Sequence, residues 1–390
     1  MRILHLASFL QGGAGRVIAD LALEQHRGGC DVRVVTSETA VPGYGNYEAY
    51  LDELKDAGVP VRQVDSLFHR QHAANLAVVR ALDNSYGAGR DPHVIHCHAA
   101  VPAMIGLLFA GARRASIATL QTMHGWGQVK SGDQVATDVT VLNLVDRVVT
   151  ASRHSVETLV SLGVSPARIS MVPYGVRGEG APLEDRDAEL LVEMTRRRRQ
   201  GALVVACVGT VGTRKNQALL VEALALLPDA PIFCVFVGDG DLDALRAAAE
   251  RAGATSRVRV HGYSRAARRV AAAADVMVLP SRSEGQPVSV VEAFCDGTLM
   301  AVSDIPELVE LVGDDMGFRF KAGDARSLAE TLTAIAALPN STRRAVRQRA
   351  RAQYLSRFTV DSMTSEYLAL YEGVVAARRK DGQRHETSVA

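Results

Sequence analysis

The chain has 390 residues and a formal net charge of +1 at pH 7, with 47% hydrophobic and 22% charged residues. This composition is typical of a soluble globular protein, and the length exceeds one ordinary core, so two or three domains are expected. The near-neutral charge argues against a general nucleic-acid binder. No apolar stretch is long enough to span a bilayer, and the start lacks a signal-peptide cleavage site. No cysteines form a C-x-x-C pair. We therefore expect a cytoplasmic protein.

The first half of the chain alternates apolar runs with helical patterns. The opening run, residues 2–8, is followed by Gly12 and Gly13 and by a helical pattern through Leu23. Strand, glycine turn and helix form a nucleotide-binding type of unit, although the glycine spacing departs from G-x-G-x-x-G. A tight turn without any ligand explains these glycines equally well. Further strand candidates are residues 32–36, 59–64, 93–97, 116–121 and 147–152.

A second series of the same kind follows residues 178–185, which have the composition of a linker. Its strand candidates are residues 203–209, 232–238, 257–262 and 275–280. Strands that alternate with helices predict an α/β fold with two doubly wound parallel sheets. We place the domains at residues 1–180 and 181–357, followed by a last helix at about 358–376 with an apolar and aromatic stripe.

The stretch SRSEGQPVSVVEAF, residues 281–294, carries two glutamates near the start of a helix. Pro287 favours the first turn of that helix, so Glu284 belongs to the preceding loop and Glu292 to the helix. The backbone N–H groups between them suit a phosphate, and ionised carboxylates accept hydrogen bonds from sugar or ribose hydroxyls. The pattern therefore suits a phosphorylated ligand with hydroxyl groups. The helix dipole alone also favours acidic residues here, so an exposed structural role stays open.

A second glycine-containing turn, residues 208–216, joins a strand to a helix and carries Arg214 and Lys215. Its glycines allow close approach to a phosphate, and the lysine adds a positive charge. The spacing is not that of a P-loop, and a basic exposed loop is the alternative. Ligands of open α/β sheets bind at the carboxyl ends of strands, so two such loops in one domain indicate a ligand site there.

Histidines stand at strand ends in the first half. His96 and His98 share a face of a strand, a pattern that zinc sites also show. No third ligand stands at a recognisable spacing, so we expect no metal and interpret His98 as facing a substrate. His124 closes another strand, beside a glycine and Trp126. Ligand contact and a structural role in the loop are both open for His124.

Together these motifs resemble the retaining glycosyltransferases of GT-B fold in glycosyltransferase family 4. The resemblance rests on a G-x(5)-K loop, a V-G-D-G turn, an H-G-Y turn and the stretch EGQPVSVVE, Glu284 to Glu292. It extends from Gly12 to the C-terminal helix. It implies two Rossmann-like domains facing each other, a nucleotide-sugar held mostly by the C-terminal one, and a last helix that returns to the N-terminal one.

The resemblance also implies roles for matching residues. Glu292 would accept hydrogen bonds from the ribose hydroxyls, and Glu284 from a hydroxyl of the donor sugar. The implied catalytic residues are His124, Lys215 and Glu284. The implied donor-binding residues are Gly12, Gly13, Arg214, Lys215, Tyr263, Glu284, Gly285, Gln286, Pro287, Val288 and Glu292. His98 and Trp126 are expected on the acceptor side.

Two positions depart from the family pattern. Thr210 stands where an arginine often follows the glycine of the phosphate loop, and Arg214 is the candidate that supplies the missing charge. The turn Tyr174–Gly175–Val176–Arg177 stands where Asn-Gly-Val-Asp is common, which bears on the interdomain hinge.

The implied reaction moves a sugar from a nucleotide-sugar, with UDP favoured, to a hydroxyl of an acceptor with retention of configuration. The leaving phosphate would take the proton of the acceptor, which agrees with the lack of an obvious base–nucleophile pair in the sequence. No metal or cofactor is expected, because cations and helix ends would stabilise the phosphates. The expected partners are the nucleotide-sugar and a small acceptor, without nucleic acid or stable membrane insertion.

The acceptor is the least determined partner. The segment Glu48–Asp56 carries four acids and only Lys55 in opposition, and an anionic lipid surface would repel it. We therefore expect a small soluble acceptor, for which a cationic compound like the aminocyclitols of antibiotic pathways is a candidate, with a lipid-linked or polysaccharide sugar as the alternative. Two other functions stay open: a nicotinamide-dependent oxidoreductase that uses the first glycine turn, and a non-catalytic relative that binds nucleotide-sugars.

Overall fold

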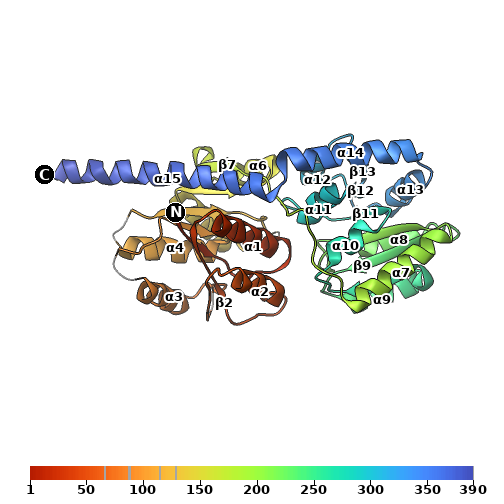
Figure 1. The fold of residues 1–390 in the computed structure, drawn as a ribbon, viewed down its shortest axis with the longest axis horizontal. Helices are drawn as coiled ribbons and strands as arrows, with labels where there is room; N and C mark the ends of the chain where they lie inside the picture. Colours follow the sequence, from red (N-terminus) through yellow and green to blue (C-terminus); the bar gives the residue numbers. More distant parts are fainter. Residues whose placement is uncertain (66, 87–88, 114–115, 128–129, 390) are drawn as a thin grey trace. The chain divides into compact units, whose positions relative to one another are not determined.

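The computed structural model describes residues 1–389 except 66, 87–88, 114–115 and 128–129. The chain forms two compact units (Figure 1). Unit 1 comprises Met1–Gly175 and Val360–Ala390, and unit 2 comprises Val176–Thr359. The boundary between Gly175 and Val176 lies a few residues before the domain boundary at 180/181 that the sequence suggested.

Unit 1 contains a parallel sheet of seven strands in the order β3-β2-β1-β4-β5-β6-β7. The strands are β1 (Arg2–Leu6), β2 (Asp31–Ser37), β3 (Val61–Val64), β4 (Val94–Cys97), β5 (Ala118–Thr122), β6 (Arg147–Thr150) and β7 (Ile169–Met171). The helices are α1 (Gly12–Arg27), α2 (Glu48–Asp56), α3 (His72–Ser85), α4 (Ala100–Arg113), α5 (Gly132–Leu144), α6 (Arg153–Ser161) and α15 (Val360–Val389). The strand order reverses between β1 and β4, so the loops that follow these two strands diverge there.

The two faces of this sheet differ in polarity. Alternate side chains of a strand point to opposite faces. Leu4, Leu6 and Ile95 join the apolar side chains of α3, α4 and α5 in one core. His5 and His96, which are neighbours in the register of β1 and β4, occupy the alternate positions. They lie under α1 and α15, and this side of the unit contains a buried polar interior.

Unit 2 contains a parallel sheet of six strands in the order β10-β9-β8-β11-β12-β13. The strands are β8 (Leu203–Val208), β9 (Ile232–Val237), β10 (Val258–Gly262), β11 (Val276–Leu279), β12 (Leu299–Ser303) and β13 (Phe318–Phe320). The helices are α7 (Asp185–Arg199), α8 (Ala218–Ala225), α9 (Leu242–Arg251), α10 (Ala267–Ala272), α11 (Val288–Asp296), α12 (Pro306–Val312), α13 (Ala325–Ala336) and α14 (Asn340–Arg357). The prediction of two doubly wound parallel α/β domains is confirmed.

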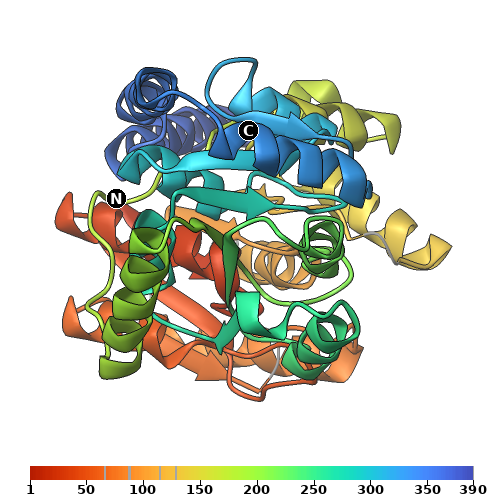
Figure 2. The same cartoon turned by 90° about the vertical axis from the view of Figure 1, so that its right-hand side faces the viewer.

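The strands of unit 2 are apolar on both faces, as parallel strands covered by helices must be. Side chains of α8, α9 and α13 pack on one face, where Val205, Phe236 and Val278 form the core. The helix α11 contacts both α10 and α14, and these three helices form a second group. Figure 2, in which unit 2 faces the viewer, shows the strands between helices. Among the described residues, no helix has both the length and the apolar character that a membrane crossing requires.

The loops after β8 and β9 touch each other through backbone atoms. Gly238, which directly follows β9, has φ +151°, and a Cβ atom there would lie 2.2 Å from the carbonyl oxygen of Gly209. The N–H of Gly209 donates to the carbonyl of Val237, and that of Val211 donates to the carbonyl of Asp239. Glycine is therefore required at 238, and the loop after β8 is held at its start.

We predict that Gly238→Ala destabilises the protein by about 3 kcal/mol, because the substitution combines a strained backbone with a steric overlap. Urea denaturation followed by circular dichroism measures this. The matched control is Gly253→Ala, where φ is +61° and nothing lies within 4 Å of the added Cβ. The control should lose only about 1 kcal/mol, and equal losses in the two variants would contradict the close approach.

Candidate active site

The candidate site of unit 2 lies where its strand order reverses. β8 and β11 are neighbours in the sheet, and the chain moves outward from them in opposite directions. The loops that follow them, residues 209–217 and 280–287, meet above the carboxyl ends of the strands. The N–H of Arg282 donates to the carbonyl of Arg214 at 2.9 Å. The crevice at such a reversal is the usual ligand position of open α/β sheets.

Glu284 is the centre of this site. Its Oε1 accepts from Lys215 Nζ at 2.6 Å and its Oε2 from Arg214 Nη1 at 2.9 Å. The carboxylate side chain is only 5% exposed. Burial raises the pKa of Glu284, but the charges of Lys215 and Arg214 outweigh it and hold this pKa below its usual value. The structure thus brings three predicted site residues together, with one buried anion facing two cations.

The next loop residues lead into α11. Pro287 is the N-cap and Val288 the first helical residue, one position after the predicted start. Gln286 is buried. The first N–H groups of a helix lack partners within it, and α11 directs them toward the loop that carries Glu284. Gly285, Gln286, Pro287 and Val288 therefore lie beside the ion pairs, as the sequence suggested.

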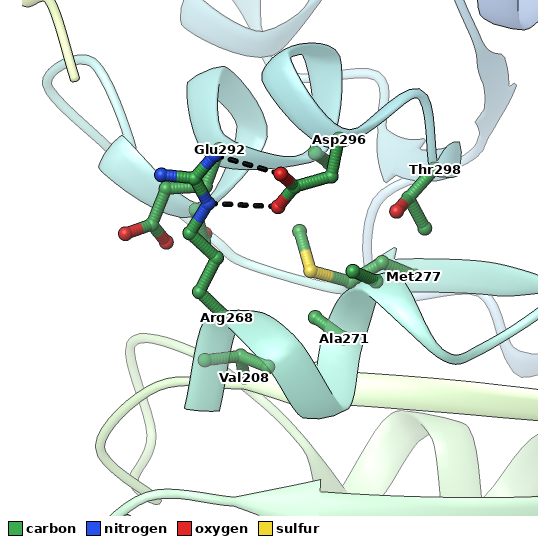
Figure 3. A pocket seen from close by; sticks show the side chains of 10 residues that line it. Val208, Arg268, Ala271, Met277, Glu292, Asp296 and Thr298 are labelled. Carbon is green, nitrogen blue, oxygen red and sulfur yellow. Dashed lines mark hydrogen bonds and ion pairs between the residues drawn. The ribbon is translucent and has the colours of Figure 1, made fainter. Parts of the chain in front are cut away.

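Glu292 lies further along α11, beside Arg268 of α10. Burial lowers the pKa of Arg268, but its hydrogen bonds with Asp296 and the negative charges of Asp296 and Glu292 outweigh burial and raise this pKa. Figure 3 shows the guanidinium of Arg268 between the two carboxylates. Asp296 accepts two hydrogen bonds from it, both at 2.7 Å. These side chains border a small pocket of about 200 Å³, part of it open to solvent, which Val208, Arg268, Ala271, Ala272, Met277, Ser289, Glu292, Ala293, Asp296 and Thr298 line.

Arg268 also holds the segment that enters unit 2. Its guanidinium donates to the carbonyl oxygens of Arg177, of Gly178 at 3.2 Å and of Glu179 at 3.3 Å. The sequence did not single out Arg268, because an arginine in a helix carries no recognisable motif. The structure assigns it contacts with both the linker and the carboxylates of α11.

Tyr263 follows β10 and is 37% exposed. The turn before it is anchored, because His261 Nε2 lies 2.7 Å from Asp187 Oδ1 of α7. Burial raises the pKa of Asp187, but the hydrogen bond from His261 prevails and lowers it. An accessible aromatic ring on a fixed turn suits stacking on a base, and this role of Tyr263 stays a prediction.

In unit 1, the predicted residues lie at the carboxyl ends of β1, β4 and β5. Gly12 and Gly13 begin α1, and Gly12 has φ +55°. His98 follows β4 and His124 follows β5. His98 Nδ1 lies 3.1 Å from His124 Nε2, so these two residues form a pair. Sequence spacing alone did not place them together.

Two partners of this pair were missed by sequence reasoning. His5 Nδ1 lies 3.0 Å from His98 Nε2, and the hydroxyl of Tyr174 lies 2.8 Å from His124 Nδ1. His5 is an ordinary member of an apolar strand in the sequence, and its register opposite His96 is the only signal for it. Both ring nitrogens of His124 are therefore occupied by protein groups.

The structure supplies the third histidine that the sequence lacked for a metal site. His5, His96 and His98 each offer a ring nitrogen, and these atoms lie within 4.8 Å of one another. All their ring nitrogens take part in hydrogen bonds, including those of His96 to Tyr371 and Thr122. A neutral imidazole has one lone pair, which a hydrogen bond here already uses. This donor set does not fit a metal without a rearrangement.

Trp126 lies on a different side of unit 1 from the histidines. It packs against the apolar core formed with α4 and α5. Lys130 Nζ lies 3.5 Å from the centre of its ring and 2.8 Å from Asp138 Oδ2. A role of Trp126 toward the acceptor stays a prediction, and its present contacts are a cation–π pair and the core.

We predict that Glu284→Gln lowers stability at pH 7 by on the order of 1–3 kcal/mol, because Arg214 and Lys215 lose the buried carboxylate that they pair with. The lowered pKa fixes the pH dependence: the stabilisation is complete above the ordinary carboxyl pKa and is lost as pH falls through the lowered folded value. Urea denaturation from about pH 7 to 3 should show the gap between wild type and variant closing. The exposed Glu330→Gln is the control, and a gap independent of pH would contradict the ionised pair.

Comparison with known proteins assigns both units. Residues 12–175 match the glycosyl transferase 4-like domain and residues 195–353 match the glycosyl transferases group 1. The chain is 29% identical over 390 residues to a D-inositol 3-phosphate glycosyltransferase of Xylanimonas cellulosilytica, covering 92% of this chain and 91% of that protein. It is 31% identical over 232 residues to the 2-deoxystreptamine glucosyltransferase of Streptomyces kanamyceticus, covering 56% of this chain and 58% of that protein.

Solved structures share the fold. The Anabaena protein HepE, in complex with UDP and glucose, matches with a TM-score of 0.79 at 18% identity, over 96% of this chain and all of that chain. Both matching domains are glycosyltransferase domains, which favours this activity over a nicotinamide-dependent oxidoreductase. The chain is therefore a glycosyltransferase of GT-B fold, with a glycosyl transferase 4-like domain followed by a group 1 domain.

Proposed function

We propose that the chain transfers a sugar from a UDP-linked donor to a hydroxyl of a small acceptor with retention of configuration and without a metal ion. The observation that carries this proposal is the convergence of Glu284, Lys215 and Arg214 beside the N-terminus of α11. Cations and helix N–H groups suit a diphosphate, and an ionised carboxylate suits a sugar hydroxyl.

The charge of this site matches the needs of the reaction. When the nucleoside diphosphate departs, negative charge accumulates on its phosphate oxygens, and fixed positive groups nearby lower the barrier. Lys215 and Arg214 supply two charges against one carboxylate. The family pattern often has an arginine at the position of Thr210, and the contact of Arg214 with Glu284 supports the idea that Arg214 supplies that charge.

Glu284 is suited to binding rather than to attack. A carboxylate whose pKa is lowered by two cations is a weak base and a weak nucleophile. This supports same-face substitution, in which the bond from the anomeric carbon to the phosphate breaks as the bond to the acceptor oxygen forms. The proton of the acceptor hydroxyl then passes to the departing phosphate. No protein group has to exchange a proton in this scheme.

Glu292 is the proposed partner of the ribose. It lies about one turn into α11 at the border of the pocket, beside the guanidinium of Arg268 (Figure 3). An ionised carboxylate can accept from two adjacent hydroxyls. HepE was solved with UDP, which supports the choice of a uracil nucleotide.

The names of the relatives support a small cyclitol acceptor, because both D-inositol 3-phosphate and 2-deoxystreptamine are ring polyols. The acidic character of α2 supports a cationic acceptor less strongly than the sequence suggested. Glu53 of this helix pairs with Arg16 of α1 at 2.8 Å and is thereby neutralised. A soluble ring polyol is the acceptor class that we propose, and antibiotic biosynthesis is one pathway that uses such acceptors. Co-sedimentation with anionic vesicles would instead favour a lipid-linked acceptor.

We predict that purified protein binds UDP more tightly than GDP or NADH in isothermal titration calorimetry, and that Glu292→Ala weakens UDP binding by about 1–3 kcal/mol. The loss reflects ribose hydroxyls left without acceptors in the complex. The exposed Glu222→Ala on α8 is the matched control and should bind UDP as the wild type does. Unchanged UDP affinity in Glu292→Ala would overturn the ribose assignment, and binding of NADH alone would overturn the proposed donor.

We predict that EDTA leaves the rate of sugar transfer unchanged, because the phosphates meet protein cations and helix N–H groups. The assay follows UDP release from UDP-sugars with 2-deoxystreptamine and myo-inositol phosphates as acceptors. Proton NMR of the product gives the configuration of the new glycosidic bond. Loss of activity in EDTA that a divalent ion restores would contradict metal independence, and an inverted product would contradict retention.

A further inference from the structure

A continuous chain of hydrogen-bonded side chains crosses the interior of unit 1. It joins residues from β1, α1, β4, β5, the segment after β7, and α15. In order, its members are Tyr174, His124, His98, His5, Gln25, Tyr371, His96, Thr122 and Tyr367. Most of these side chains are less than 3% exposed, and His124 is the most accessible of the four histidines.

Gln25 sets the direction of this chain, because its amide has one end that only accepts and one end that only donates. In the structure its Oε1 lies 2.8 Å from His5 Nε2, and with the amide in this orientation that nitrogen carries a proton. Its Nε2 donates to the hydroxyl of Tyr371 at 3.3 Å. Each neutral imidazole has one N–H and one lone pair, so the direction passes from one ring to the next.

Toward the carboxyl end of the strands, this orientation of Gln25 sets the direction from ring to ring. The proton of His5 is on Nε2, so His5 Nδ1 accepts from His98 Nε2–H at 3.0 Å. His98 Nδ1 then accepts from His124 Nε2–H at 3.1 Å. His124 Nδ1 is left with a lone pair, which accepts from the hydroxyl of Tyr174 at 2.8 Å.

The other branch is consistent with the same direction. Tyr371 accepts from Gln25 and uses its own proton to donate to His96 Nδ1 at 2.6 Å. His96 Nε2–H then donates to Thr122 at 2.7 Å. In this arrangement both Tyr174 and Tyr371 donate a phenolic O–H to an imidazole lone pair. All four histidines therefore have the proton on Nε2.

The surroundings keep the four rings uncharged. Burial lowers the pKa of His5 and of His124 to about 4, and it lowers those of His96 and His98 well below the usual histidine value. Outside the chain, Cys30 lies near Tyr371 and Glu366 near Tyr367. An imidazolium at His5 or His98 would also place two N–H groups against each other.

We propose that this series of hydrogen-bonded side chains fixes His124 as the neutral Nε2–H tautomer, so that His124 Nδ1 can only accept. Gln25 is the positioning residue, because its amide sets the direction of the hydrogen bonds. The partner of His124 Nδ1 must be a hydrogen-bond donor, such as a hydroxyl. Tyr174 fills this position in the structure, and a hydroxyl of the donor sugar takes it during turnover. This last step rests on the proposed function, whereas the tautomer does not.

The tautomer is tested on the full-length wild-type protein labelled with ¹⁵N-histidine. Imidazole ¹⁵N shifts distinguish protonated from unprotonated nitrogens, and single His→Gln variants assign the signals. Between about pH 6 and 8, His5, His96, His98 and His124 should remain neutral with the proton on Nε2. An Nδ1–H tautomer or an imidazolium at His98 or His124 would overturn the proposal, irrespective of any activity.

The role of Gln25 is tested with Gln25→Met, which keeps the length of the side chain but removes both amide ends. His5 then lacks its acceptor, so the linked tautomers of His5, His98 and His124 should become mixed. The kcat/KM for the donor should fall about tenfold, the effect of one misdirected hydrogen bond. Asp20→Asn, a buried change on the same helix whose partner is Arg16, is the control and should leave the tautomers unchanged. Unchanged tautomers in Gln25→Met would remove Gln25 from the proposal.

Donor analogues test the contact with substrate separately. Fluorine can replace a hydroxyl but cannot donate a hydrogen bond. At one sugar position, deoxy and deoxyfluoro donors should lose activity equally, and this loss should disappear in His124→Phe. Activity retained by the fluoro donor would show that the hydroxyl accepts from His124 and would overturn the direction. If no position depends on His124, the substrate contact is wrong while the tautomer result stands.

A cobalt titration separates the hydrogen-bonded chain from a metal site. Every lone pair of His5, His96 and His98 is already used, so Co(II) should produce no stoichiometric visible absorption band. A band that saturates at one equivalent and is lost in His5→Gln would overturn the chain in favour of a three-histidine metal centre.

Discussion

The reversal of strand order within each sheet is the constraint on which both candidate sites depend. Strands β8 and β11 are adjacent, yet the chain leaves them in opposite directions, so the two following loops separate around an open crevice. Arg214 and Lys215 lie on the loop after β8. Glu284 lies on the loop after β11, 69 residues from Lys215. The same reversal between β1 and β4 brings the loop at Gly12 and the histidines after β4 and β5 to one edge of the other sheet.

The two units stabilise polar side chains at these edges in different ways. In unit 2, charges compensate each other: a buried carboxylate is kept ionised by two cations, one of which is 52% exposed. In unit 1, the buried groups are uncharged and are satisfied by a chain of hydrogen bonds. A buried polar group without a partner costs about 1–3 kcal/mol, so each member of that chain depends on its neighbours. The C-terminal helix α15 contributes Tyr367 and Tyr371 to it, and is thus part of the polar interior of unit 1.

The contacts in the two units explain both departures from the family pattern. Arg214 reaches the same carboxylate as Lys215, so the positive charge expected beside Thr210 is present from a different position in the loop. Tyr174 stands where an asparagine is common, and its hydroxyl occupies His124 Nδ1. Gly175 is the last residue of unit 1 before the linker, so the residue that occupies His124 lies at the end of the segment leading out of the unit. The linker beyond it is held by Arg268.

The sequence by itself determined the repeated α/β pattern, the loops that carry Arg214, Lys215 and Glu284, and the start of α11 to within one residue. These features depend on local rules: the period of apolar residues, the preference of proline for helix starts and the use of glycine in turns. Only the tertiary structure decided that His5 joins His98, that Gln25 gives the chain its direction and that Arg268 holds the linker. Such contacts join residues that are 93, 20 and 90 positions apart, and they depend on strand order and register, which no local pattern records.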